Sequence, residues 1–462
     1  MKATRRAPQL PVVTVDGRGV VSHAGTALLR ELADRSGLTS GLSAALAGSR
    51  SRRGGHDPGR VAVDVAVVIA DGGAVISDLR TLADQGLLHG PVASTATAWR
   101  VLDGVDEQVL AGLRRARAAA RERAWAARGE WTGTELPGSR VADRMIEHAV
   151  IDVDATLVEA HSEKDSAAPH YKGGFGFHPL LAFLDNTGEA LAGILRPGNA
   201  AAHDAGDHVR LLELALAQLP DAWRTKPILI RADSAGGTRR FVGELADTGV
   251  EYSIGFRVTE ALRTAIAGVP RRGWTPAIDT DGYPREGADV AEITGMLTLT
   301  GWPTGMRVIV RRERPHPGAQ LNAFEERDGW RYQAFITNTT TGQLAFLDAR
   351  HRAHARVEDR IRTGKQCGLG KFPSQLAHVN AAWLELALTA TDLLAWMRTG
   401  LLAGEPDLAR AEPRLRRYRI LHVAARVTRG ARRTRLRLAE HWPWALALAR
   451  AFARLREIPL PA

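Results

Sequence analysis

The sequence predicts an α/β protein in which a mixed sheet occupies the middle of the chain, with helical regions on either side. Apolar residues recur at helical spacing through roughly the first 140 residues. Short strand-like runs then alternate with helical segments from about residue 147, and helical spacing returns near residue 343. With 45% hydrophobic and 24% charged residues, the chain has an ordinary globular composition and is long enough for two or three domains.

The N-terminal region is expected to be mainly helical. A helix that starts at Ser94 with several polar residues could be a recognition helix that presents this end to DNA bases. The alternative is a capped helix that packs Trp99 into a core. A later helix over 113–128, rich in Ala and Arg, could lie along a DNA backbone or serve as a solvated linker. The other helices expected here cover 27–35, 60–69 and 75–82, and the Ser94 helix covers 94–102.

The middle of the chain has the order of elements of a ribonuclease-H-like core. This order is three strands, a helix, a strand, a second helix and a fifth strand. The first three strands lie close enough in sequence to form an antiparallel meander. The seven elements are expected at 148–153, 179–185, 190–195, 204–219, 227–231, 238–247 and 251–256.

A mainly β insertion is predicted to interrupt this core. The helical period fades after residue 256, and β-like runs at 307–310 and 332–337 alternate with turns rich in Gly, Pro and charge. Helical spacing returns afterwards, so the rest of the core is expected to be helical. A helical, Arg-rich tail is expected to end the chain.

Positive charge is concentrated at the C-terminal end. The net charge is +11 and the pI is about 10.4. Residues 401–462 contain 14 Arg, no Lys and five acids, a surplus of nine positive charges that leaves only +2 for the first 400 residues. A solvated, charge-rich pair of helices would account for this composition. Contact with nucleic-acid phosphates is the better explanation, because guanidinium groups match phosphate oxygens in geometry and charge.

The sequence argues against several classes of protein and site. Cys367 is the only cysteine, which excludes an internal disulfide and a zinc site of several thiolates. The most apolar stretch, 61–69, is interrupted by Asp64 and is too short to cross a bilayer. No Cys–His or Ser–His arrangement suggests a protein nucleophile. We therefore expect a soluble, cytoplasmic protein.

Three acids are candidates for a metal-dependent active site. Asp154 and Asp233 each follow a predicted strand, and Glu358 lies on the helix that returns after the insertion. Three carboxylates brought together would repel one another unless cations relieved the repulsion, and oxygen ligands suit Mg²⁺ or Mn²⁺. Two such ions would support in-line phosphoryl transfer. Asp152 is an alternative to Asp154, or a supporting group on the same strand face, and Asp359 is a weaker alternative to Glu358.

The Glu358 helix carries basic residues at the same spacing. Positions three or four apart along a helix share one face. Cations on both sides of a catalytic Glu could bind the phosphates of the strand being cut. An exposed ion pair between Glu358 and Arg362 is the alternative. The members of this stripe are His351, His354, Glu358, Arg362 and Lys365.

Several motifs of the chain, taken together and in this order, resemble the insertion-sequence 1380 family of bacterial DDE transposases. The resemblance extends from GPVASTATAWRVL to RRTRLRLAEHWPWA and so covers most of the chain. It rests on four runs: IDVDATLVEAHSEK, HPLLAFLDNTGEALAGILRPGNA, LIRADSAGG and HARVEDRIRTGKQCGL.

The resemblance implies a function, a cofactor and a partner. The function is a DNA transposase that binds the terminal inverted repeats of an insertion sequence and cuts and joins strands at the bacterial nucleoid. Asp154, Asp233 and Glu358 match the catalytic acids, which would hold two Mg²⁺ or Mn²⁺ ions. A homodimer would bind double-stranded DNA at both the terminal repeats and the target. The implied DNA contacts are Arg362, Lys365 and His354 beside the Glu, with Arg416, Arg417, Arg432 and Arg433 in the Arg-rich tail.

The resemblance also sets the expected division of the chain. One departure from it is His354, where related transposases often have Arg. The expected parts are a helical DNA-binding region (1–145), the first part of the core (146–256), the β-rich insertion (257–342), the core helices that carry the Glu (343–400) and the tail that contacts DNA or forms oligomers (401–462). Two other functions stay open: a nuclease or resolvase of the same fold, and a DNA-binding regulator without catalysis.

Overall fold

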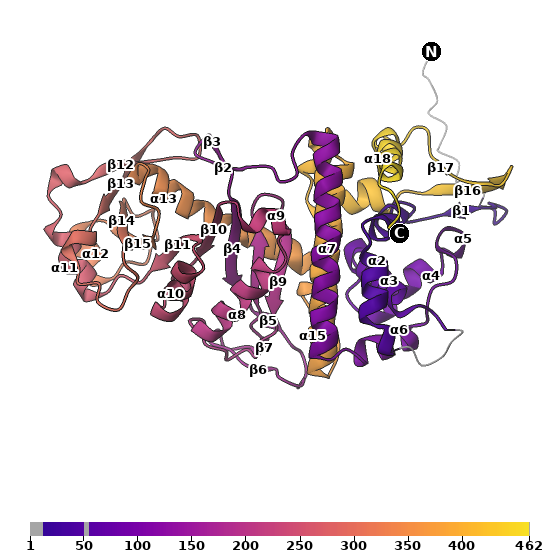
Figure 1. The fold of residues 1–462 in the computed structure, drawn as a ribbon, viewed down its shortest axis with the longest axis horizontal. Helices are drawn as coiled ribbons and strands as arrows, with labels where there is room; N and C mark the ends of the chain where they lie inside the picture. Colours follow the sequence, from indigo (N-terminus) through magenta and orange to yellow (C-terminus); the bar gives the residue numbers. More distant parts are fainter. Residues whose placement is uncertain (1–12, 50–54, 462) are drawn as a thin grey trace, which may run out of the picture.

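The computed structural model describes residues 13–49 and 55–461, and its largest sheet is mixed and has nine strands (Figure 1). The strand order is β12-β13-β14-β15-β11-β10-β4-β8-β9. In this order the strands are Thr275–Ile278, Pro284–Glu292, Arg307–Glu313, Arg331–Thr337, Glu251–Phe256, Ile228–Ala232, Ala149–Ala155, Leu180–Leu184 and Glu189–Ile194.

The five strands predicted from the sequence make up one side of this sheet. β4, β8 and β9 form the expected antiparallel meander, and β10 runs parallel to both β4 and β11. Alternate side chains of β8 enter different cores, as the pleat requires. Leu181 and Phe183 belong to the core that includes α15 (Ala377–Trp396), whereas Leu180 and Leu184 pack with α8 (Ala205–Leu216). Both faces of the strand are buried, which explains its continuous apolar sequence.

The segment predicted as a β insertion extends the same sheet. β15 pairs antiparallel with both β11 and β14, and β13 and β12 continue outward to the edge. The β-like runs seen in the sequence lie in β14 and β15. Three helices belong to this half: α11 (Glu260–Gly268), α12 (Ala323–Asp328) and α13 (Leu344–Arg352), the last of which packs against β12 and β13.

The Arg-rich helix expected over 113–128 does form, but its central arginines are buried inside the protein. They therefore contact neither a DNA backbone nor solvent, which corrects both interpretations. The helix is part of α7 (Glu107–Thr132), which stands beside α15 between the sheet and the helices at the other end (Figure 1). Arg117 and Arg121 are fully buried there and share Asp392, at 2.9 and 2.6 Å. The Ala residues of α7 allow this close packing, and each buried guanidinium has a carboxylate partner, as burial of charge requires.

Most of the remaining helices form a layer on the far side of α15 (Figure 1). α6 starts at the predicted N-cap, where Ser94 accepts a hydrogen bond from the Thr97 amide. Trp99 is 39% exposed, so the alternative in which this helix packs Trp99 into a core is wrong. The helices are α1 (Thr26–Arg35), α2 (Leu38–Ala45), α3 (Pro58–Asp71), α4 (Arg80–Ala83), α5 (Gly86–His89) and α6 (Thr95–Asp103).

The C-terminal tail is not purely helical, which corrects the prediction. A β-hairpin of β16 (Ala425–Gly430) and β17 (Arg433–Leu438) stands before the last helix, α18 (Ala445–Glu457). The sequence here alternates arginine with apolar residues, which is the period of a strand and not of a helix. β16 also pairs with β1 (Val20–Val21), so the two ends of the chain share a small sheet. Among the described residues no helix is long and apolar enough to cross a membrane.

Candidate active site

Two of the predicted catalytic acids lie at matching positions at one edge of the sheet. β4 and β10 are parallel neighbours in which Val153 pairs with Ala232. Asp154 and Asp233 each come one residue later, so both stand at the carboxyl ends of adjacent strands. The polypeptide leaves β10 at this point because the Asp233 carboxylate accepts a hydrogen bond from the Ala235 amide, 2.9 Å away, and begins a turn.

Glu358 is brought to the same edge by α14 (Arg356–Gly364), which contacts β4. The electrostatics of Asp154 show that the three acids act on one another. Burial raises the pKa of Asp154 to about 6, and the nearby carboxylates of Asp233 and Glu358 add to this rise, while His354 opposes it. The site therefore concentrates negative charge.

These acids differ from their neighbours in having no cationic partner. Within the described part of the chain, no ion pair joins Asp154, Asp233 or Glu358 to Arg or Lys. The other acids around the site are paired: Asp152 with Arg231 at 2.7 Å, Asp185 with Arg231 at 3.1 Å, Asp348 with Arg311 at 3.0 Å, and Asp359 with Arg362 at 3.0 Å. The donor set of three free carboxylates fits hard divalent cations.

The three carboxylates are spread across the site and do not converge on one point. Their oxygens do not all lie within 4.8 Å of one another, a spacing that among the described residues only His23, Asp71 and His422 meet.

Asp152 supports the site from the interior. It shares a strand face with Asp154, as the sequence suggested, and lies opposite Arg231 on β10. Arg231 donates hydrogen bonds to both carboxylate oxygens of Asp152, at 2.7 and 2.8 Å, and His354 Nδ1 lies 2.9 Å from one of these oxygens. Burial alone would raise the pKa of Asp152, but the charge of Arg231 and the contact with His354 hold this pKa below its ordinary value. Asp152 thereby positions the His354 imidazole near Asp154.

The predicted basic stripe is broken into separate pieces. A 3₁₀ turn, Ala353–Ala355, separates α13 from α14, and a π-helical turn, Lys365–Leu369, follows α14. His351 stacks on Phe335 with ring centroids 4.5 Å apart, and burial lowers its pKa to about 3. It is therefore a neutral packing group and carries no charge for a phosphate.

The other members of the stripe face different neighbours. Arg362 pairs with Asp359 at 3.0 Å and with Glu412 at 3.2 Å, so the ion pair considered between Arg362 and Glu358 does not form. Lys365 donates from Nζ to the carbonyl of Leu157, 2.9 Å away, in the loop that follows β4.

The predicted DNA contacts in the tail divide into two kinds. Arg416 and Arg417 are buried and donate to carbonyls of the chain itself, Arg417 to Ala70 at 2.7 Å. Their burial argues against phosphate contacts at these two positions. Arg432 and Arg433, by contrast, are exposed at the tip of the β16–β17 hairpin.

A cavity of about 690 Å³ opens beside the acids. Its lining includes Asp233, Glu358 and His354, together with residues of β11 and β15. Arg257, which follows β11, also lines it and is exposed. Sequence reasoning missed Arg257, although its place just after the fifth predicted strand was a usable signal. The cavity lining thus combines two of the candidate acids with an exposed arginine that forms no ion pair within the described part of the chain.

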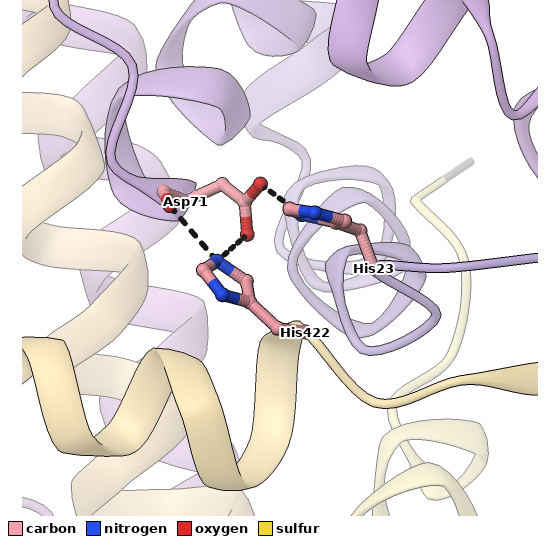
Figure 2. Close-up of side chains that lie close together, drawn as sticks. All are labelled: His23, Asp71 and His422. Carbon is pink, nitrogen blue, oxygen red and sulfur yellow. Dashed lines mark hydrogen bonds and ion pairs between the residues drawn. The ribbon is translucent and has the colours of Figure 1, made fainter. Parts of the chain in front are cut away.

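A separate cluster joins the two ends of the chain (Figure 2). His23 Nδ1 lies 2.6 Å from one oxygen of Asp71, and His422 Nε2 lies 3.1 Å from the other and 3.2 Å from the Asp71 carbonyl. Burial alone would raise the pKa of Asp71, but the contacts with the two histidines hold this pKa below its ordinary value. Both histidines contact Asp71, and we interpret this cluster as a structural link between α3 and the tail.

A comparison with protein families identifies the family of the chain. The family model described as "Transposase DDE domain group 1" matches residues 7–460. No curated protein matches the sequence. Among solved structures, a cryo-EM structure of the piggyBac transposase synaptic complex with hairpin DNA is similar, with 8% identity and a TM-score of 0.43, over 88% of this chain and 83% of the other.

Proposed function

Given that the chain belongs to the transposase DDE domain group 1 family, we propose that Asp154, Asp233 and Glu358 are its catalytic acids and hold two divalent cations. We further propose that it belongs to the insertion-sequence 1380 family within this group. On this proposal it binds the terminal inverted repeats of its element as a homodimer, then cuts and joins DNA strands. The strand order β9-β8-β4-β10-β11, a meander followed by two parallel strands, supports a ribonuclease-H-like core.

One observation carries the assignment of the acids. Around this sheet edge the chain neutralises Asp152, Asp185 and Asp348 with arginines, while Asp154, Asp233 and Glu358 have no such partner among the residues that the structure describes. Leaving three neighbouring carboxylates unpaired is unfavourable for stability, as the raised pKa of Asp154 indicates. Such a cost is typical of functional sites, where a cation or substrate offsets it.

The residues around the acids have distinct proposed roles. When bound, two Mg²⁺ or Mn²⁺ ions would activate a water or a 3′ hydroxyl and stabilise the leaving oxygen. Arg257, which lines the cavity beside Asp233 and Glu358, and Lys365, which follows α14, would bind the phosphates of the cut strand, with Arg362 on α14. His354, held by Asp152, is a positioning residue that adds positive charge beside Asp154 when protonated.

The test is cleavage of a labelled duplex that carries the flanking inverted repeat, in Mg²⁺ and in Mn²⁺. We expect Asp233→Asn and Glu358→Gln each to lower the rate of cutting by at least about 1,000-fold, since the ions contribute several kcal/mol to transition-state stabilisation. Asp359→Asn is the matched control, because it removes an adjacent carboxylate of the same helix that is already paired with Arg362.

The outcomes separate the proposal from its alternatives. Cutting by the wild type and by Asp359→Asn, but not by the other two variants, supports the assignment. Equal cutting by all four proteins refutes it. Cutting without joining of pre-cleaved ends would indicate a nuclease or resolvase, and metal-independent binding without cutting would indicate a regulator.

A further inference from the structure

The β16–β17 hairpin is unusually rich in arginine. Its 14 residues, 425–438, include six arginines and no acid. All six are exposed. The hairpin projects at the end of the molecule opposite α11 and α12, beyond the helices that flank α15 (Figure 1). The six are Arg426, Arg429, Arg432, Arg433, Arg435 and Arg437.

The pairing register sorts these side chains onto two faces. Directly opposed residues in an antiparallel pair point to the same side, and alternate residues share a face. Arg426 is opposite Arg437, Thr428 is opposite Arg435, and Gly430 is opposite Arg433. One face therefore carries four arginines. The other carries Ala425, Val427, Leu436 and Leu438, which pack on the core, with Arg429 and Thr434 near the tip.

The arginine face has no partner within the described part of the chain. None of its four guanidiniums forms an ion pair there, and the contact that Arg437 makes is with the Thr428 hydroxyl at 3.4 Å. Like charges directly opposite each other, as in Arg426 and Arg437, destabilise a hairpin. Elsewhere the protein pairs its arginines closely, as at Arg117 and Arg121. The face is therefore built for an external anion and not for the stability of the hairpin.

We propose that this face, Arg426, Arg433, Arg435 and Arg437, is a binding site for the phosphates of double-stranded DNA, separate from the acids; the proposal rests on the proposed function of the chain. A two-stranded ribbon fits the major groove of B-DNA. Arg433, Arg435 and Arg437 follow one another along β17 over about 14 Å, and each DNA strand offers a phosphate for about every 3.4 Å of helix axis. The hairpin would hold flanking DNA while the acids act on the strand to be cut.

The test is binding of a 30-base-pair duplex of arbitrary sequence in EDTA, measured by fluorescence anisotropy over a range of salt. Each lost phosphate contact should reduce the slope of log K against log salt by about 0.9, or about eightfold in affinity at 0.1 M salt. We expect about eightfold for Arg435→Gln, more than about 100-fold for the Arg433→Gln/Arg435→Gln/Arg437→Gln triple variant, and recovery for Arg435→Lys. Arg429→Gln, on the other face, is the matched control and should change affinity less than twofold.

Each outcome counts for or against the hairpin. Equal losses in Arg429→Gln and Arg435→Gln, or unchanged binding by the triple variant with an intact melting curve, would overturn the proposed face. A duplex RNA bound as tightly, with the same losses, would overturn DNA as the partner. Asp233→Asn should bind like the wild type. If the wild type binds by this face but never cuts, the catalytic proposal fails and the hairpin site stands.

Discussion

Asp154→Asn should make the metal-free protein more stable at neutral pH while it abolishes cutting. The carboxyl is partly buried, and burial together with Asp233 and Glu358 raises its pKa from 3.8 to about 6. An acid whose pKa is raised on folding contributes stability that is fully present below the unfolded pKa and lost as the pH rises through the folded pKa. The ionised wild type therefore carries a penalty above pH 6 that the isosteric amide avoids.

The size of this penalty follows from the shift. Two pKa units correspond to roughly 3 kcal/mol, and solvent access to the carboxyl lowers the expected gain to about 1–3 kcal/mol. An unfolding entropy of about 2.1 cal/mol/K per residue gives about 1 kcal/mol/K for 462 residues, so Tm should rise by about 1–3 °C. The difference in Tm between the variant and the wild type should develop between about pH 4 and pH 6 and stay constant above pH 6.

Calorimetry in EDTA at several pH values measures this effect, with Asp359→Asn as the control. Addition of Mg²⁺ should raise the Tm of the wild type more than that of Asp154→Asn, because the wild type retains the charge that binds the ion. A variant that melts at or below the wild-type temperature at pH 7.5 would refute the reasoning that burial and the neighbouring acids penalise the ionised Asp154 in the folded protein.

Two further changes test the interior. Arg231→Met leaves Asp152 and Asp185 buried without this partner and should lower the free energy of unfolding by about 3–5 kcal/mol in urea titrations; an unchanged midpoint would show that the pairs add nothing. The contact with Asp71 raises the pKa of His422. This contact therefore stabilises the folded protein fully below the unfolded pKa of about 6.5, and the stabilisation is lost as the pH rises through the folded pKa. His422→Gln should therefore cost more stability at pH 6 than at pH 9, and a pH-independent cost would contradict this.

The strands and the candidate acids followed from local sequence. β4, β8, β9, β10 and β11 lie within two residues of their predicted limits, because strands buried on both faces leave continuous apolar runs with turns at their ends. Asp154 and Asp233 stood out because each follows such a run, and parallel pairing places both at one edge of the sheet. Glu358 was the harder case, since helix geometry only made Asp359 a weaker alternative and the resemblance to a family motif was needed to single out Glu358.

The partners of the charged residues could not be predicted in the same way. Arg121 reads as a solvated helix residue, yet it is buried between Glu189 and Asp392, which are distant in sequence. The hairpin was not predicted either, although arginine and apolar residues alternate within 425–438 with the period of a strand.

By itself, the sequence determined the strands, the positions of the acids and the excess of positive charge near the C-terminus, because each depends on residues close together along the chain. Only the tertiary structure decided which charges are neutralised. It paired Asp152 with Arg231 and left Asp154 free, and it buried Arg417 while exposing Arg435. Whether a charge is available to metal or DNA depends on the dielectric and the opposite charges around it, and folding brings these from distant segments of the chain.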